Sequence, residues 1–125
     1  MQHTIKPTES ELEILQVLWA EGRATVRKVH ETLQAFKDAG YTTTLKLLQI
    51  MYEKGLVDRD DSGKTHIYFA LASKEKMQQQ LLNKMVTNFF NGSPTQLVMQ
   101  ALGNQKPSEA EIAEIEALLQ QYKNK

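Results

Sequence analysis

The spacing of apolar residues predicts a first helix, which begins at a capping box formed by Thr8 and Glu11 and ends before Gly22. Four large apolar side chains recur between these limits at helical intervals: Leu12, Leu15, Leu18 and Trp19. An amphipathic helix of this kind buries one face in a core. We therefore expect a structural role for it, with Trp19 as a core anchor rather than a ligand platform.

A second helix is expected after Thr25, whose hydroxyl can cap it. Its apolar stripe consists of Val26, Val29, Leu33 and Phe36. Arg27 and Lys28 lie in the first turn, where cations oppose the helix dipole. Their position favours a nearby anion that neutralises them. A solvated surface pair is the alternative reading, and the sequence leaves it open.

The third predicted helix runs from Thr42, which can cap it, to Gly55, which can end it in a left-handed conformation. One face is apolar, with Thr44, Leu47, Leu48 and Met51, and the opposite face carries Thr42, Lys46, Gln49 and Glu53. Lys46 is the only charged residue between Ala39 and Tyr52. Hydroxyls, an amide and one cation can bond base edges and phosphates. The pattern therefore predicts a DNA-reading helix, with an ordinary amphipathic surface helix as the alternative.

The pattern changes period after Gly55 and predicts a β-hairpin. Leu56 and Val57 precede the polar turn Asp60-Asp61-Ser62-Gly63, and Thr65 to Leu71 is rich in β-branched and aromatic residues. Three helices followed by a hairpin form a winged helix-turn-helix, in which the third helix enters the major groove and the hairpin flanks the DNA backbone. Lys64 and His66 are placed to touch phosphate, whereas the hairpin carboxylates, Asp58, Asp60 and Asp61, would be repelled.

The last third of the chain predicts three more helices, from Ser73 to Phe90, from Ser93-Pro94 to Gly103, and from the capping box of Ser108 and Glu111 onward. Their apolar faces are too large to be hidden by one another. A second copy of the chain is our preferred partner, because a two-fold dimer lets two recognition helices reach half-sites one helical turn apart. The expected dimer contacts are Met77, Leu81, Met85, Phe89, Ile112, Ile115, Leu119 and Tyr122. Folding back onto the first domain is the alternative.

The predicted fold class is thus mostly α with a small β-hairpin. We expect a winged-helix DNA-binding domain at residues 1–72 and a helical dimerisation domain at residues 73–125. Fifteen Lys and Arg balance fifteen Asp and Glu, so DNA binding has to use a local patch rather than overall charge. The balance also supports a rival hypothesis, a winged helix that binds a protein partner.

Composition excludes several other kinds of chemistry. The absence of cysteine removes disulfides, thiolate metal sites and Cys nucleophiles, and is compatible with a reducing cytoplasm. The N-terminal segment lacks the apolar core of a signal peptide, and the uncharged stretch from Met85 to Gln105 is interrupted by Gly92 and Pro94, so we expect a cytoplasmic protein without membrane insertion. His3, His30 and His66 are too scattered for a metal site. Without a phosphate loop or nucleophile elbow, neither enzyme activity nor a cofactor is expected.

Almost the whole chain resembles the penicillinase-repressor family, which includes the BlaI and MecI regulators and the copper-responsive CopY repressors. The similarity is carried by ESELEILQVLWAEGRATVRKVHETL, GYTTTLKLLQIMYEKGLV, HIYFAL, LVMQAL and EIAEIEALL. The resemblance implies a homodimeric winged-helix repressor that binds inverted repeats in promoters. The family's DNA-contacting region falls on Thr42, Thr43, Lys46 and Gln49, supported by Arg27, Lys28 and the hairpin.

The chain departs from the family's pattern in two places. Leu45 and Ile50 stand where polar or basic residues are frequent in relatives, and they could meet thymine methyl groups or pack beneath the preceding loop. Antibiotic-responsive members are released when a membrane-bound metalloprotease cuts an Asn-Phe bond in the tail. The matching stretch here is Met99-Gln100-Ala101-Leu102, which puts a sensor protease as partner in doubt. Copper sensing through paired tail cysteines is excluded.

Overall fold

The computed structural model describes residues 6–125, so His3 lies outside the described residues. The chain divides into two compact units, and the division falls between Gln78 and Gln79. This division falls later than the expected domain boundary after residue 72, within a helix rather than before it. The assignment of a DNA-binding and a dimerisation role to the two parts stays a prediction.

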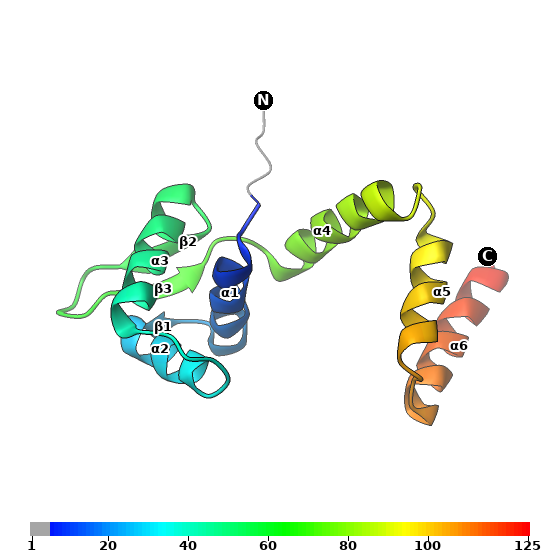
Figure 1. The fold of residues 1–125 in the computed structure, drawn as a ribbon, viewed down its shortest axis with the longest axis horizontal. Helices are drawn as coiled ribbons and strands as arrows, with labels where there is room; N and C mark the ends of the chain where they lie inside the picture. Colours follow the sequence, from blue (N-terminus) through cyan, green and yellow to red (C-terminus); the bar gives the residue numbers. More distant parts are fainter. Residues whose placement is uncertain (1–5) are drawn as a thin grey trace. The chain divides into compact units, whose positions relative to one another are not determined.

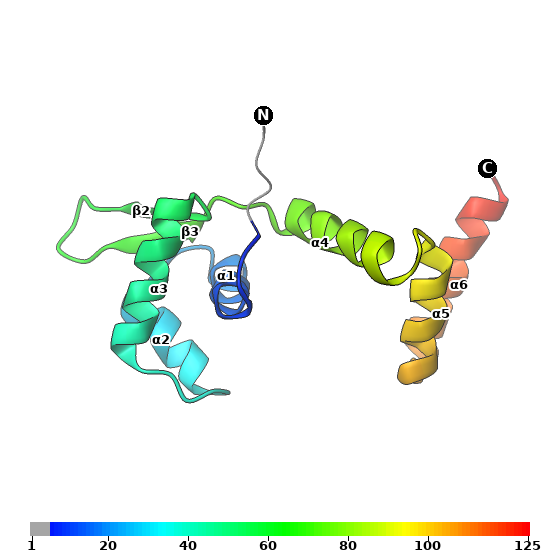
Figure 2. The ribbon, with the colours of Figure 1, turned by 45° about the horizontal axis from the view of Figure 1, so that its top comes forward.

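The first unit contains three helices and a small antiparallel sheet (Figures 1 and 2). The elements are α1 (Glu9–Glu21), β1 (Ala24–Thr25), α2 (Val26–Gln34), α3 (Tyr41–Lys54), β2 (Val57–Asp60) and β3 (Ile67–Ala70). The strand order is β1-β3-β2, and Tyr68 of β3 pairs with Ala24 on one side and Arg59 on the other. The expected mostly helical fold with a hairpin is confirmed. The strand β1 was not predicted, because two residues are too few to show an alternating pattern.

Most of the helix limits read from the sequence are found in the structure. Thr8 and Glu11 form the capping box of α1, and the Thr25 hydroxyl caps α2 by accepting a bond from the Lys28 N–H. Gly55 ends α3 with φ 83° and ψ 14°, a left-handed conformation that glycine adopts without steric cost.

The predicted cap of α3 is wrong. The N-cap is Gly40, which makes no side-chain cap bond, and the helix already begins at Tyr41. Thr42 therefore lies inside the first turn, where its side chain is exposed. The Thr44 hydroxyl donates to the Gly40 carbonyl oxygen at 3.3 Å instead, which ties the buried side of the helix to its own start.

The core of the first unit lies where α1, α2, α3 and the sheet meet. The residues at its centre are Ile14, Leu15, Leu18, Val29, Leu48, Met51, Leu56, Val57 and Tyr68, all at most 2% exposed. Trp19 anchors α1 to the end of the hairpin through its Nε1–H, which donates to the Ala72 carbonyl oxygen at 2.9 Å. Phe36 was expected in the stripe of α2 but is 61% exposed, because α2 ends at Gln34 and the chain turns away before Phe36.

A buried carboxylate joins the first helix to the last turn of α3. The Oε1 atom of Glu11 accepts hydrogen bonds from the Thr8 N–H at 2.9 Å and from the Lys54 ammonium at 2.6 Å. Burial alone raises the pKa of Glu11, but these two partners outweigh it, so its pKa lies below the usual value of 4.5. The charged form of Glu11 therefore holds the C-terminal end of α3 against the start of α1.

The second unit consists of helical segments, and α4 crosses into it from the first unit. The helices are α4 (Lys74–Phe89), α5 (Pro94–Asn104) and α6 (Glu109–Lys123). Ser93 caps α5, and Ser108 and Glu111 form the predicted capping box of α6. The turn after α4 uses two positive φ angles, at Asn91 and Gly92. Among residues 6–125, no helix is both long and apolar enough to cross a membrane.

We predict that Glu11→Ala lowers the free energy of unfolding by about 2–3 kcal/mol, because it removes a buried charge pair and one half of a capping box. The matched control is Glu13→Ala, which removes the partner of Lys37 at a site that is 36% exposed, and which should cost less than about 1 kcal/mol. Urea titrations of both variants measure the difference. Equal losses of unfolding free energy in the two variants would show that the buried ion pair of Glu11 stabilises the fold no more than the exposed pair of Glu13.

The lowered pKa of Glu11 also predicts how stability changes with pH. Its contribution is fully present above the pKa of the unfolded chain and is lost as the pH falls through the lower pKa of the folded chain. The gap in unfolding free energy between the unmodified protein and Glu11→Gln should therefore be constant from about pH 7 to pH 5.5 and shrink below about pH 4.5. A gap that stayed unchanged to about pH 3 would contradict the assignment.

Candidate nucleic-acid interface

The outer face of α3 is a row of exposed polar side chains. Thr42, Thr43, Lys46 and Gln49 are all exposed, and within residues 6–125 none of these side chains makes a hydrogen bond or an ion pair with the rest of the chain. The opposite face holds the helix in place, since Thr44, Leu48 and Met51 are buried. The four polar groups are thus presented to solvent by a helix whose position is set by the core.

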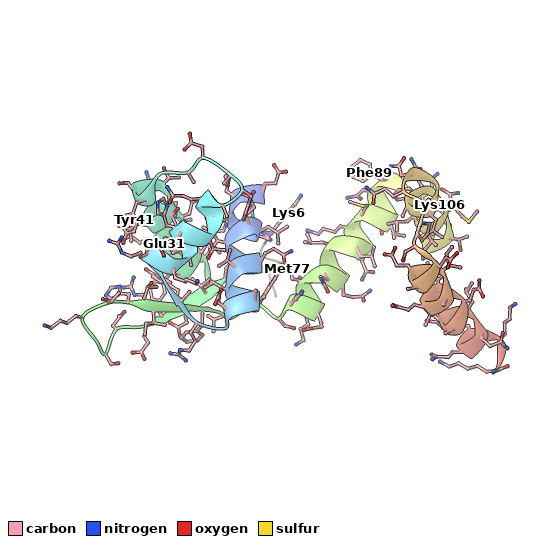
Figure 3. The ribbon with its side chains drawn as sticks, turned by 90° about the horizontal axis from the view of Figure 1, so that it is seen from below. Lys6, Glu31, Tyr41, Met77, Phe89 and Lys106 are labelled. Carbon is pink, nitrogen blue, oxygen red and sulfur yellow. The ribbon has the colours of Figure 1, made fainter. Side chains whose placement is uncertain are left out.

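The start of α2 adds two cations beside this face. Arg27 and Lys28 are exposed in its first turn, and the Arg27 guanidinium lies 6.0 Å from the centre of the Tyr41 ring. The Tyr41 ring also meets His30 edge-on at 5.4 Å between ring centroids. Figure 3 shows Tyr41 beside α2. Sequence reasoning missed Tyr41, although an aromatic residue at the start of a polar helix face was a usable signal.

The loop of the hairpin, residues 61–66, extends beyond the helices (Figures 1 and 2) and carries Lys64 and His66, both exposed. The Nε2 atom of His66 lies 3.5 Å from a carboxylate oxygen of Asp61, and the same oxygen lies 3.1 Å from Nε of Arg59. Asp61 therefore faces two basic groups, which reduces the repulsion that it would exert on a phosphate.

Asp60 is partnered as well. Its Oδ1 accepts hydrogen bonds from the Ser62 hydroxyl at 2.6 Å and the Ser62 N–H at 2.9 Å, and its Oδ2 lies 3.5 Å from Arg23. The Ser62 hydroxyl is the main cause of a lowered pKa of Asp60, helped by the Ser62 N–H. The Asp60 carboxylate is thus charged and bonded locally, and the Asp61 carboxylate lies beside two basic side chains. The expected repulsion is weakened, though not abolished.

A cleft of about 580 Å³ lies between the starts of α2 and α3 and the hairpin. It is lined by Thr25, Val26, Arg27, Tyr41, Leu45, Lys64, Thr65, His66 and Tyr68. Three of the expected phosphate-binding residues, Arg27, Lys64 and His66, meet here although they are distant in the sequence, whereas Lys28 is not part of the lining. No carboxylate lines the cleft. Within residues 6–125, Arg27 and Lys64 form no ion pair, whereas His66 already lies beside Asp61. The two unpaired cations suit a phosphate or another anion.

The second unit exposes most of the apolar residues expected at a dimer interface. Met85, Phe89, Ile112, Leu119 and Tyr122 are between 37% and 76% exposed, and Phe89 is labelled in Figure 3. Further exposed apolar side chains, not singled out from the sequence, are Leu82, Val98, Met99, Leu102 and Leu118. Large apolar side chains exposed in this number leave much apolar surface in water, which favours a partner that covers it.

Three other expected contacts are less accessible. Leu81 and Ile115 are half-buried within the chain. Met77 is only 6% exposed and belongs to the first unit, because it lies in the first turn of α4. Its side chain has little area left to offer a second copy, so the useful contacts are those further along α4 and in α6.

The chain matches the family model described as penicillinase repressor over residues 7–121. It is 23% identical to the methicillin resistance regulatory protein MecI of Staphylococcus aureus (strain N315) over 116 residues, which cover 93% of this chain and 94% of MecI. It is 22% identical to the penicillinase repressor of Bacillus licheniformis over 118 residues, which cover 94% of this chain and 92% of that protein.

Two solved structures have a similar fold. The DNA binding domain of the repressor BlaI superposes with a TM-score of 0.52 at 19% identity, covering 59% of this chain and 90% of that domain. A MarR family protein from Bacillus stearothermophilus superposes with a TM-score of 0.57 at 21% identity, covering 96% of this chain and 75% of that protein. These similarities confirm the fold expected from the sequence.

Proposed function

Because the chain belongs to the penicillinase repressor family, whose members are DNA-binding transcriptional repressors and not enzymes, we propose that it represses transcription as a homodimer bound to inverted-repeat operators. Each protomer inserts α3 into the major groove and rests its hairpin on the DNA backbone. The cytoplasm, where bacterial promoters lie, is the proposed location.

The observation that carries the proposal is the exposed polar face of α3. Thr42, Thr43, Lys46 and Gln49 are free of bonds to the described part of the chain, so their donors and acceptors are available to base edges and phosphates. Side chains already bonded within the protein would have to exchange those bonds for bonds to DNA. The helix is also rigid, since its opposite face belongs to the core.

The cationic cleft supplies the backbone contacts of the proposal. Arg27 from α2 and Lys64 and His66 from the hairpin face one space beside α3. The sugar-phosphate backbone that borders the major groove next to α3 would pass beside this cleft. The chain as a whole has a formal net charge of zero, so attraction of DNA rests on this local arrangement. The rival hypothesis, a winged helix that binds a protein, does not explain why Arg27 and Lys64 converge on a cleft whose lining contains no carboxylate.

Dimerisation is proposed through the second unit. Two copies that pair the exposed apolar side chains of α4 and α6 would remove them from water, which is the main source of stability in a homodimer interface. The family resemblance implies release by cleavage of an Asn-Phe bond in the tail, and the matching residues Met99-Gln100-Ala101-Leu102 contain no such bond.

A gel-shift titration tests the proposal directly. The full chain is titrated against promoter DNA of its own gene and of neighbouring genes, at several salt concentrations and with competitor DNA. A complex on one or two inverted repeats that survives competitor and weakens as salt increases is expected for a sequence-specific repressor. Absence of any complex above the non-specific background would overturn the proposal and favour the protein-binding alternative.

Lys46→Ala should weaken operator binding by about tenfold and reduce the slope of log affinity against log salt by about one, if Lys46 contacts a phosphate. The dimer should stay intact, because Lys46 is exposed on α3. The control is Lys76→Ala, which removes an exposed cation from α4. Fluorescence anisotropy with labelled operator measures both affinities. Unchanged binding by Lys46→Ala would remove this residue from the interface.

Leu119→Asp should shift the protein from dimer to monomer in sedimentation velocity, because a dimer would have to bury an unpaired carboxylate. Leu119 is 54% exposed in the single chain, so we expect the protomer to fold with the carboxylate in contact with water. Gln120→Asp places the same charge one residue further along α6 and should leave the dimer intact. A dimer mass for Leu119→Asp would show that the interface lies elsewhere.

A further inference from the structure

Three large apolar side chains on α3 are exposed: Tyr41 at 43%, Ile50 at 36% and Tyr52 at 38%. The structure explains two of them. Tyr52 is covered by the Arg59 guanidinium, which lies 4.2 Å from its ring centre, and the aromatic ring of Tyr41 faces both Arg27 and His30. For Ile50, 36% of the surface is exposed, and this apolar area faces water on the helix that is proposed to read DNA.

The helical geometry places Ile50 on the reading face rather than at its edge. At about 100° per residue, Ile50 lies within about 40° of both Thr43 and Lys46 around the helix axis. Leu48, on the other side of the helix, is fully buried. The second unusual apolar residue, Leu45, is half-buried and lines the cleft beside the hairpin. Ile50 therefore projects toward the groove and Leu45 does not.

The chemistry of the major groove limits what Ile50 can contact. An isoleucine side chain has no donor or acceptor, so it would leave the polar edges of guanine, cytosine and adenine without a bond. The C5 methyl group of thymine is the apolar group on the base edges of the major groove, and it distinguishes T from the other bases. Contact between the two removes both apolar surfaces from water.

We propose that Ile50 is a specificity-determining residue that contacts the methyl group of one thymine in each operator half-site. The proposal rests on the proposed function, since it needs α3 in the major groove. In this proposal Ile50 makes an apolar contact with a base, while Thr43 and Lys46 beside it make polar contacts. The neighbouring Leu45 is assigned no base contact.

Deoxyuridine substitution tests this contact, because deoxyuridine pairs like thymidine but lacks the methyl group. Each thymine of the operator is replaced in turn, and affinity for the full chain is measured by fluorescence anisotropy. For the unmodified protein we expect about a three- to fivefold loss at one position in each half-site, the value of one buried methyl group. Ile50→Ala should bind the unmodified operator more weakly and show no further loss at that position.

Leu71→Ala serves as the control variant. Leu71 is 55% exposed and lies after β3, outside the proposed interface. This variant should keep the full deoxyuridine response. Because Ile50 is exposed, Ile50→Ala should fold normally, which circular dichroism checks.

The outcomes separate the contact from the proposed function. Specific operator binding with the same deoxyuridine response in the unmodified protein and in Ile50→Ala would overturn the methyl contact alone. The methyl contact would also be overturned if no deoxyuridine replacement lowered the affinity of the unmodified protein for the operator. Failure of the unmodified protein to bind any duplex specifically would overturn the proposed function and, with it, the role of Ile50.

Discussion

The buried carboxylate of Glu11 is the constraint on which the geometry of the first unit depends. It receives the N–H of Thr8 at the start of α1 and the ammonium of Lys54 at the end of α3, so a shift of either helix would leave a charge buried without its partner. That penalty is larger than the net stability such a pair provides. We infer that the ion pair of Glu11 and Lys54 chiefly sets the orientation of α3, while the apolar core supplies most of the stability. The contact between Glu11 and Lys54 therefore also sets the direction in which the exposed polar face of α3 points.

The local distribution of charge explains how a chain with zero net charge can offer an anion site. Asp60 and Asp61 in the hairpin are engaged by Ser62, Arg23, Arg59 and His66, and the lining of the cleft beside α3 includes Arg27 and Lys64 but no carboxylate. The hairpin carboxylates are therefore largely neutralised by their own neighbours, while Arg27 and Lys64 form no ion pair within residues 6–125. At physiological ionic strength, fields are screened beyond about 8 Å. This local arrangement matters more for DNA binding than the sum of charges over the chain.

Local signals in the sequence were sufficient for most of the fold. Caps at Thr8, Thr25 and Ser108 and the left-handed Gly55 are decided by residues close in sequence, and the hairpin follows from its turn. Features that depend on distant segments were missed. The strand β1 exists because Ala24 and Thr25 pair with β3, and the role of Tyr41 depends on packing against α2. The polar face of α3 was readable from its period, whereas the convergence of Arg27 with Lys64 and His66 needed the tertiary structure.

The low overall charge also bears on how a repressor of this kind would find its operator. Non-specific affinity for DNA comes almost entirely from phosphate contacts, and in the proposed interface each protomer contributes only Arg27, Lys28, Lys46, Lys64 and His66. A modest set of cations keeps random DNA a weak competitor. Discrimination then has to come from base contacts in the major groove. An apolar side chain among hydroxyls and an amide suits that role, because it rejects polar base edges as well as accepting a methyl group. The exposed Ile50 on α3 therefore fits a protein that gains selectivity from shape and polarity rather than from charge.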